Sequence, residues 1–380
     1  MCPAGTAFLW GKDSMSCQSK KYSFDIAGES DSRSILAIME EEPSRGPLSI
    51  IHTRRPDPVK SFTADCDCEV YVIRDTDNGE PATIGACDFR KLYINGEAKQ
   101  VGYFHGLRVA KKYRGMVPLS PFLKSSIDRN SGNGTACFIA TALADNPDGQ
   151  DFLEKKRDSM PSFVKICGYD VIALSTRRKA RSIKGFSLRQ ADDSNIESII
   201  DYINEKGKEY LFYPMLDVAE VRRGRYPGLR VGDFYCLENI AGEIVAAGAA
   251  WDQSSYKQYI VRNYSTPIKF LNSISRATPF LGLPRLPKPG SNLEFFTLSF
   301  WSAENAVVFN IFVDLVSFER NRYPFYLVGI TETHPFRNSL KKQRCITFSS
   351  VLYVYDLENN QWLTQLSDSS RVPYLECGLL

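Results

Sequence analysis

The sequence predicts an α/β protein made of two tandem copies of one domain, each with a mixed, mostly antiparallel sheet and helices on both faces. Residues 22–36 and 186–200 both show a short alternating strand, a polar turn and the capped start of an amphipathic helix. The Gly-Glu-x4-Gly-Ala pattern of 79–86 recurs at 242–249, at nearly the same distance along the chain. A length of 380 residues also exceeds what one core usually accommodates. Shared strand and turn composition is the alternative explanation of the repeat.

Composition indicates a protein of a reducing, aqueous compartment. The formal net charge of +3 is too small to indicate a nucleic-acid partner. Ten cysteines show no paired framework, and several stand in apolar strand-like runs where cysteine serves as a small hydrophobe. The first residues lack the basic start of a signal peptide, and no stretch approaches the roughly 18 apolar residues of a membrane span. We therefore expect a cytoplasmic protein without a membrane or nucleic-acid partner.

The chain divides into four parts. Residues 1–20 are expected to form an irregular tail, and 21–177 the first domain. Residues 178–185 are a basic stretch that could bind nucleic acid, but no aromatic platform accompanies it. A solvated linker is the preferred interpretation. The second domain is expected over 186–380.

Strands and helices follow the same order in both predicted domains. In the first, turn signals and alternation predict strands and helices at these positions: strands 69–74, 82–92, 100–109, 136–142 and 169–175, helices 118–129 and 149–164. The second domain adds a Pro- and Gly-rich connection over 265–291, of a length expected to cover a site or an interface. It is followed by the remaining elements: strand 293–301, helix 305–319, strand 325–331 and strand 346–355.

The segment 102–115 contains a strand ending in Leu-x-Val and then a Tyr-Arg-Gly turn before a helix. This pattern resembles the central motif of the GNAT superfamily of acyl-CoA-dependent N-acyltransferases. The Gly-Glu hairpin before the motif and the late pair Gly168-Tyr169 fit the same family. The resemblance covers 22–175 well and extends to the second half through the repeat, with 298–335 tracking 107–147. It implies two tandem GNAT-like domains.

The resemblance also implies an acyl-CoA co-substrate, acetyl-CoA or another acyl-CoA, bound in the first domain. Backbone N–H groups at the turn and at the helix N-terminus would face the pyrophosphate. The preceding strand would pair with the pantetheine arm, and a backbone N–H would stabilise the oxyanion. The residues assigned to the cofactor in this way are Leu107, Arg108, Val109, Arg114, Gly115, Met116, Val117, Leu119 and Asn146. The acceptor would be an amine of a small molecule, an amino acid or a peptide.

His105 and Tyr103 are the candidate catalytic residues. His105 faces the same side of the predicted strand as Tyr103, and it could deprotonate an incoming ammonium group. A hydrogen-bonded core histidine is the alternative. Glu332 and His334 form a second polar pair, for which a loop-end role is preferred.

No metal site is expected from the sequence. The two cysteines of Cys66-x-Cys68 are closer together than in a usual zinc motif. No second cysteine pair or histidine pair stands nearby in the sequence.

The sequence also departs from the family pattern. Val117 and Leu119 stand where the family turn has glycines, and Pro118 has no N–H to donate. The second copy has no glycine over 303–308, and no tyrosine stands a few residues before Gly168. Two hypotheses follow: an N-acyltransferase with its cofactor in the first domain, or a non-catalytic GNAT-fold scaffold or binding module. The acyl group and the oligomeric state are not predicted.

Overall fold

A computed structural model describes residues 21–41, 48–155, 163–177, 183–265, 287–341, 343, 345–357 and 371–380. The predicted tail 1–20, most of the linker and most of the connection 265–291 lie outside these residues. The first half contains strands β1 (Tyr22–Ile26), β2 (Leu48–Thr53), β3 (Asp67–Asp75), β4 (Pro81–Ile94), β5 (Glu97–Val109), β6 (Thr135–Leu143) and β7 (Val164–Ser175). Its helices are α1 (Ser32–Glu40), α2 (Pro58–Phe62), α3 (Ser120–Asn130) and α4 (Pro147–Glu154), with 3-10 turns at Glu29–Asp31 and Lys111–Tyr113.

The second half has a similar order. Its strands are β8 (Phe186–Gln190), β9 (Phe234–Asn239), β10 (Ile244–Trp251), β11 (Gln258–Tyr264), β12 (Phe295–Ala303), β13 (Phe325–Thr331) and β14 (Cys345–Asp356). Its helices are α5 (Ile196–Gly207), α6 (Val218–Arg222), α8 (Ala306–Glu319) and α9 (Arg337–Lys341), with 3-10 turns at Val231–Asp233 and Cys377–Leu379. None of the described helices is long and apolar enough to cross a membrane.

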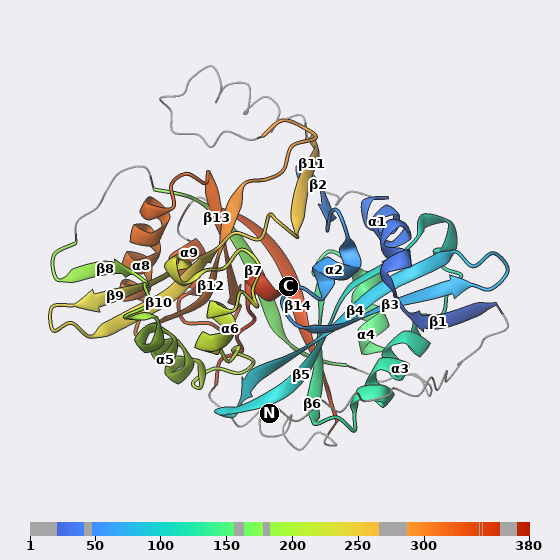
Figure 1. Cartoon of the computed structure of the whole chain (residues 1–380), viewed down its shortest axis with the longest axis horizontal. Helices are drawn as coiled ribbons and strands as arrows, with labels where there is room; N and C mark the ends of the chain where they lie inside the picture. Colours follow the sequence, from blue (N-terminus) through green and yellow to red (C-terminus); the bar gives the residue numbers. More distant parts are fainter. Residues whose placement is uncertain are drawn as a thin grey trace, which may run out of the picture.

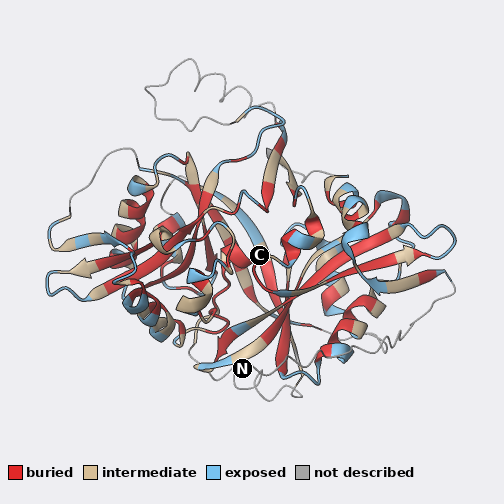
Figure 2. Ribbon diagram, viewed as in Figure 1, coloured by how far each residue is buried: buried red, intermediate tan, exposed pale blue. Residues whose placement is uncertain are grey.

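A single mixed sheet of twelve strands runs through both halves, in the order β1-β3-β4-β5-β6-β14-β7-β13-β12-β10-β9-β8 (Figure 1). Among the described strands of this sheet, only the pairs β5–β6 and β12–β13 are parallel. The predicted α/β fold class with a mixed, mostly antiparallel sheet is confirmed. Buried residues follow these strands through both halves (Figure 2).

The centre of the sheet is built by exchange between the halves. Strand β14, from the end of the chain, lies between β6 and β7, and β7 in turn lies between β14 and β13. The sequence predicted β7 as the last strand of the first domain and did not predict this position. Exchange joins the two halves through continuous backbone hydrogen bonds.

A second, two-stranded sheet also connects the halves. Strand β2 of the first half pairs antiparallel with β11 of the second. Next to it, the Ser61 hydroxyl donates to the Tyr256 carbonyl at 2.5 Å. The two halves are therefore joined here by β2, β11 and the contact of Ser61 with Tyr256.

Helices cover both faces of the sheet in the first half. On β5, Phe104 packs edge-on against Phe122 of α3, whereas the next residue, His105, packs against Phe62 of α2. Successive side chains of a strand point to opposite faces, so α2 and α3 lie on opposite sides. The helix predicted over 149–164 is shorter than expected. It ends at Glu154, and Val164 already pairs with β14 as the start of β7.

Candidate active site

Strands β5 and β6 separate in the middle of the first half. Their parallel ladder ends where Phe104 pairs with Ala140. Beyond that point β5 continues along β4 as far as Val109, and β6 continues along β14 as far as Leu143. We call the space between 105–109 of β5 and the end of β6 the first opening. Diverging parallel strands leave backbone edges that can pair with an extended ligand.

A β-bulge in β5 lies at this opening. The register with β4 shifts between Ile84 and Ala86, so that Gly106 and Leu107 stand opposite Gly85 alone. Gly106 has φ of 65°, a conformation that costs little only for glycine. A Cβ there would lie 3.3 Å from the ring of Phe62.

The second half has the equivalent opening, between β12 and β13. The parallel ladder ends where Leu298 pairs with Val328, and the register with β10 shifts between Ala247 and Ala249. Leu298 is therefore equivalent to Phe104. The sequence predicts that 298–335 corresponds to 107–147, which places Leu298 opposite Leu107 in the alignment. The structure shows that this start is wrong by three residues, because Leu298 corresponds to Phe104, the residue at which the parallel ladder ends.

The C-terminal segment fills this second opening. The backbone N–H of Phe300, at the bulge, donates to the Glu376 carboxylate at 2.6 Å. The Gly378 N–H and the Tyr374 hydroxyl donate to the same carboxylate, each at 2.8 Å. Burial raises the pKa of Glu376, although the hydrogen bonds from Gly378 and Phe300 act in the opposite direction. The turn Cys377–Leu379 packs against β12 and β13.

Exposure separates the two openings clearly. Leu107 and Leu143, on the two sides of the first opening, are 37% and 53% exposed. Counted from the ladder ends and bulges, their equivalents are Trp301 and Thr331, which are 2% and 1% exposed. The first opening is thus accessible along its walls, and the second is closed.

His105 stands at the start of the first opening in a polar pair. Its Nε2 lies 2.9 Å from Oδ1 of Asp88 on β4, and its side chain is 9% exposed. Burial alone would raise the pKa of Asp88, but the charge and hydrogen bond of His105 and the charge of Arg90 hold it well below its ordinary value. An ionised Asp88 orients the imidazole.

Tyr103 faces the same side as His105, as predicted. The two rings are stacked with centroids 5.2 Å apart. The Tyr103 hydroxyl and Thr141 Oγ1 of β6 are 2.9 Å apart, which bridges the strands where they separate. Burial raises the pKa of Tyr103, so the hydroxyl keeps its proton at neutral pH.

The turn after β5 leads into α3 as the motif predicted. Arg114, Gly115 and Met116 are exposed, and Gly115 has φ of 73°. Val117 and Leu119, which replace the family glycines, pack against the apolar core of the first half. Their side chains therefore have a structural role in this chain.

The remaining predicted cofactor residues make local contacts. Arg108 donates from Nη1 to the Met39 carbonyl of α1 at 3.2 Å. Asn146 is exposed and caps α4, because its Oδ1 accepts from Gly149 N at 3.1 Å. Val109 is half-buried beside the core.

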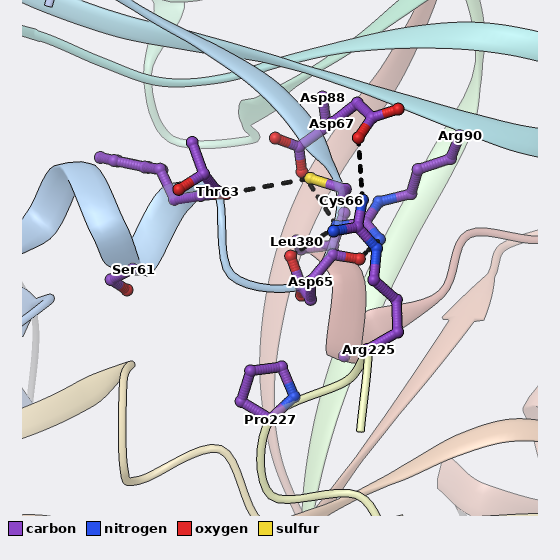
Figure 3. A network of polar contacts seen from close by, with 12 residues as sticks. Ser61, Thr63, Asp65, Cys66, Asp67, Asp88, Arg90, Arg225, Pro227 and Leu380 are labelled. Atoms are coloured by element: carbon purple, nitrogen blue, oxygen red, sulfur yellow. Dashed lines mark hydrogen bonds and ion pairs between the residues drawn. The ribbon is translucent and has the colours of Figure 1, made fainter. Parts of the chain in front are cut away.

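A buried ionic cluster beside His105 was not predicted. Arg90 donates to Asp65 Oδ1 at 3.0 Å and to Asp88 Oδ2 at 3.1 Å (Figure 3). Lys257 contacts the main-chain oxygen of Leu380, and burial together with the charge of Arg54 lowers its pKa to about 8. These residues are far apart in the sequence. The one local signal is the pair Asp88 and Arg90 within the mostly apolar strand β4.

Solved structures of other proteins have a similar fold. The chain is similar to Saccharomyces cerevisiae N-myristoyltransferase with bound myristoyl-CoA, with a TM-score of 0.56 and 8% identity over 89% of this chain and 80% of that one. It is similar to a GCN5-related N-acetyltransferase from Sphaerobacter thermophilus, with a TM-score of 0.53 and 10% identity over 88% and 96% of the two chains. A probable N-acyltransferase of unknown function from Enterococcus faecalis V583 has a TM-score of 0.52 and 8% identity over 90% and 74%. No family model and no curated protein sequence matches the chain.

Proposed function

We propose that this chain, which has the tandem GNAT-like fold, transfers an acyl group from acyl-CoA to an amine, and that the co-substrate binds in the first opening. The observation that carries the proposal is the contrast between an accessible first opening, with Leu107 37% exposed, and a second opening closed by Glu376. Among the described residues, the walls of the opening are thus exposed in the first half and buried in the second. All described cysteines are free thiols, which supports a cytoplasmic location.

In the proposed complex, pantetheine lies along 107–109 of β5, and the pyrophosphate lies at the turn 114–119. The turn offers the N-terminus of α3 and the cation of Arg114. Pro118 and the side chains of Val117 and Leu119 leave fewer N–H groups and less space than a glycine turn provides. Arg114 therefore carries much of the phosphate recognition, and Asn146 flanks the cofactor.

The reaction proposed at the first opening is a single acyl transfer. The amine nitrogen forms a bond to the thioester carbon as the carbon–sulfur bond breaks, and backbone N–H groups at the bulge stabilise the developing oxyanion. His105, oriented by Asp88, takes the proton of the amine. The protonated Tyr103 hydroxyl supplies a proton to the leaving thiolate.

Binding of acyl-CoA tests the proposal. At 100 times its dissociation constant, a ligand adds about 2.7 kcal/mol to the free energy of unfolding. We expect acetyl-CoA or a longer acyl-CoA to raise the melting temperature of the full chain. Arg114→Glu should weaken binding by at least about tenfold, since a charged hydrogen bond contributes about 1.5–3 kcal/mol. The matched control is Arg129→Glu, an exposed position at the other end of α3, which should change affinity less than about twofold.

The competing function is a scaffold or binding module without catalysis. It is favoured by Val117 and Leu119, whose side chains pack into the core where a phosphate-binding turn is open. If no acyl-CoA of any chain length shifts the melting temperature, the scaffold is the correct interpretation.

The repeated architecture bears on domain organisation as well. A β-bulge occurs in β5 opposite Gly85 and in β12 opposite Gly248, and these two glycines are paired with each other by the sequence repeat. This supports the proposal that 21–177 and 186–380 are two copies of one domain.

A further inference from the structure

We infer that Cys66, Cys68 and Asp88 form a binding site for one divalent, thiophilic cation of the zinc class. The two Sγ atoms and a carboxylate oxygen of Asp88 all lie within 4.8 Å of one another. Cys66 and Asp88 are buried, and Cys68 is half-buried. Two thiolates and a carboxylate are ligands that zinc accepts, and magnesium and calcium prefer oxygen alone.

The sheet produces this arrangement from residues that the sequence keeps apart. Cys66 directly precedes β3 and Cys68 is the second residue of that strand, so both thiols stand at the start of β3. Asp88 of β4 is the direct cross-strand partner of Cys68. The third ligand, which the local sequence lacks, therefore comes from the neighbouring strand.

Neighbouring groups complete the surroundings of such an ion. Arg90 donates to Asp88 Oδ2 at 3.1 Å and to the carbonyl of Asp65, which fixes the carboxylate beside Cys66 (Figure 3). His105 Nε2, on the next strand, lies 2.9 Å from Asp88 Oδ1 and holds the other oxygen of the carboxylate. Hydrogen bonds to a ligating carboxylate orient it and raise metal affinity.

The nearby cationic side chains do not prevent binding of a divalent metal ion, because binding leaves the net charge of the cluster unchanged. Arg54, Arg90 and Lys257 line the same cluster as Asp65 and Asp88. Binding exchanges protons for metal: one M²⁺ enters, the two thiols become metal-bound thiolates, and two protons leave to solvent. The total charge of the buried cluster is therefore the same before and after binding. The site shares Asp88 with the His105 pair of the proposed acyl transfer, but binding of the ion can be measured without any acyl-transfer activity.

Titration with Co²⁺ tests the site in the full chain after treatment with a chelator. We expect one equivalent to bind with the thiolate-to-cobalt charge-transfer absorption, and Zn²⁺ to displace it. Cys68→Ala should weaken binding by more than about 100-fold, the upper end of what loss of an outer-shell partner costs. Cys87→Ala is the matched control, because Cys87 precedes Asp88 on β4 but packs into the core of the first half. It should bind as the parent does.

A second measurement on the unaltered chain avoids any effect of substitution on folding. Cys68 and Cys345 are both half-buried free thiols. Zn²⁺ at ten times its dissociation constant should slow alkylation of Cys68 by about tenfold and leave Cys345 unchanged, as mapped by mass spectrometry. Absence of the charge-transfer absorption in the parent, or equal alkylation of Cys68 with and without Zn²⁺, overturns the inference.

Discussion

The two openings of the sheet have the same backbone arrangement, but the first has exposed walls and the second is filled by the C-terminal segment. Both follow a short parallel ladder, and both carry a bulge in which the central residue has positive φ. In the first half that residue is Gly106, and Leu107 beside it is accessible. In the second it is Phe300, fully buried and bonded to Glu376. The same element can thus have exposed walls or hold a segment of its own chain.

The difference shows what a bulge needs in order to persist. Glycine takes the left-handed conformation without steric cost, so Gly106 needs no partner. For Phe300, with φ of 52°, the same conformation costs roughly 1–2 kcal/mol. The hydrogen bond to Glu376 and the contacts of the Phe300 ring with Trp251 and Tyr226 offset that cost.

Removing the carboxylate from the second opening should have the largest effect. Glu376→Ala leaves the N–H groups of Phe300 and Gly378 and the Tyr374 hydroxyl without their acceptor. We expect the free energy of unfolding to fall by about 3–5 kcal/mol in chemical denaturation. Glu332→Ala, at an exposed position next to β13, is the control and should stay within about 0.5 kcal/mol. Equal effects of the two substitutions would show that Glu376 does not hold the segment.

Acid should weaken the second half through His334. Burial lowers the pKa of this residue to about 4 from 6.5. The unfolded chain then binds the proton first, so stability falls as pH drops from about 6.5 towards 4, by up to about 3 kcal/mol. His334→Asn keeps an acceptor for the Phe336 N–H and should remove this part of the pH dependence. Denaturation curves at several pH values measure it, and parallel curves for parent and variant would contradict the assignment.

Gly106→Ala tests the first opening directly. An alanine would have to keep the left-handed conformation of this position at a steric cost, and its Cβ would approach the Phe62 ring. We therefore expect the free energy of unfolding to fall by about 1–2 kcal/mol and acyl-CoA binding to weaken. Gly132→Ala is the control, since that glycine has no positive φ and open space around it. A neutral result at Gly106 would mean that the bulge tolerates side chains in both halves.

Asn146→Ala should have the smallest effect and separates two roles. Loss of the cap on α4 should lower the free energy of unfolding by about 1 kcal/mol. If Asn146 also contacts the cofactor as the sequence predicted, affinity for acyl-CoA falls about 3- to 10-fold, the value of one neutral hydrogen bond. Unchanged affinity, measured by calorimetry, would limit Asn146 to its role as a cap.

Much of the fold was accessible from the sequence because its signals are local. Alternation and turn residues predicted the strands around 69–92 and 325–331, and the apolar helix predicted over 305–319 is α8. Similarly, the Tyr-Arg-Gly turn correctly predicted a strand followed by α3. The shared face of His105 and Tyr103 followed from the period of two in a strand.

The sequence by itself determined most of the sheet strands, helices such as α3 and α8, and the tandem α/β class, because these depend on patterns within short segments. Only the tertiary structure decided which strands are neighbours. The position of β14 between β6 and β7, the closure of the second opening by Glu376, and the meeting of Cys68 with Asp88 all join residues distant in the chain. Such contacts depend on how whole strands are ordered and registered in one sheet, and a local pattern carries no record of that order.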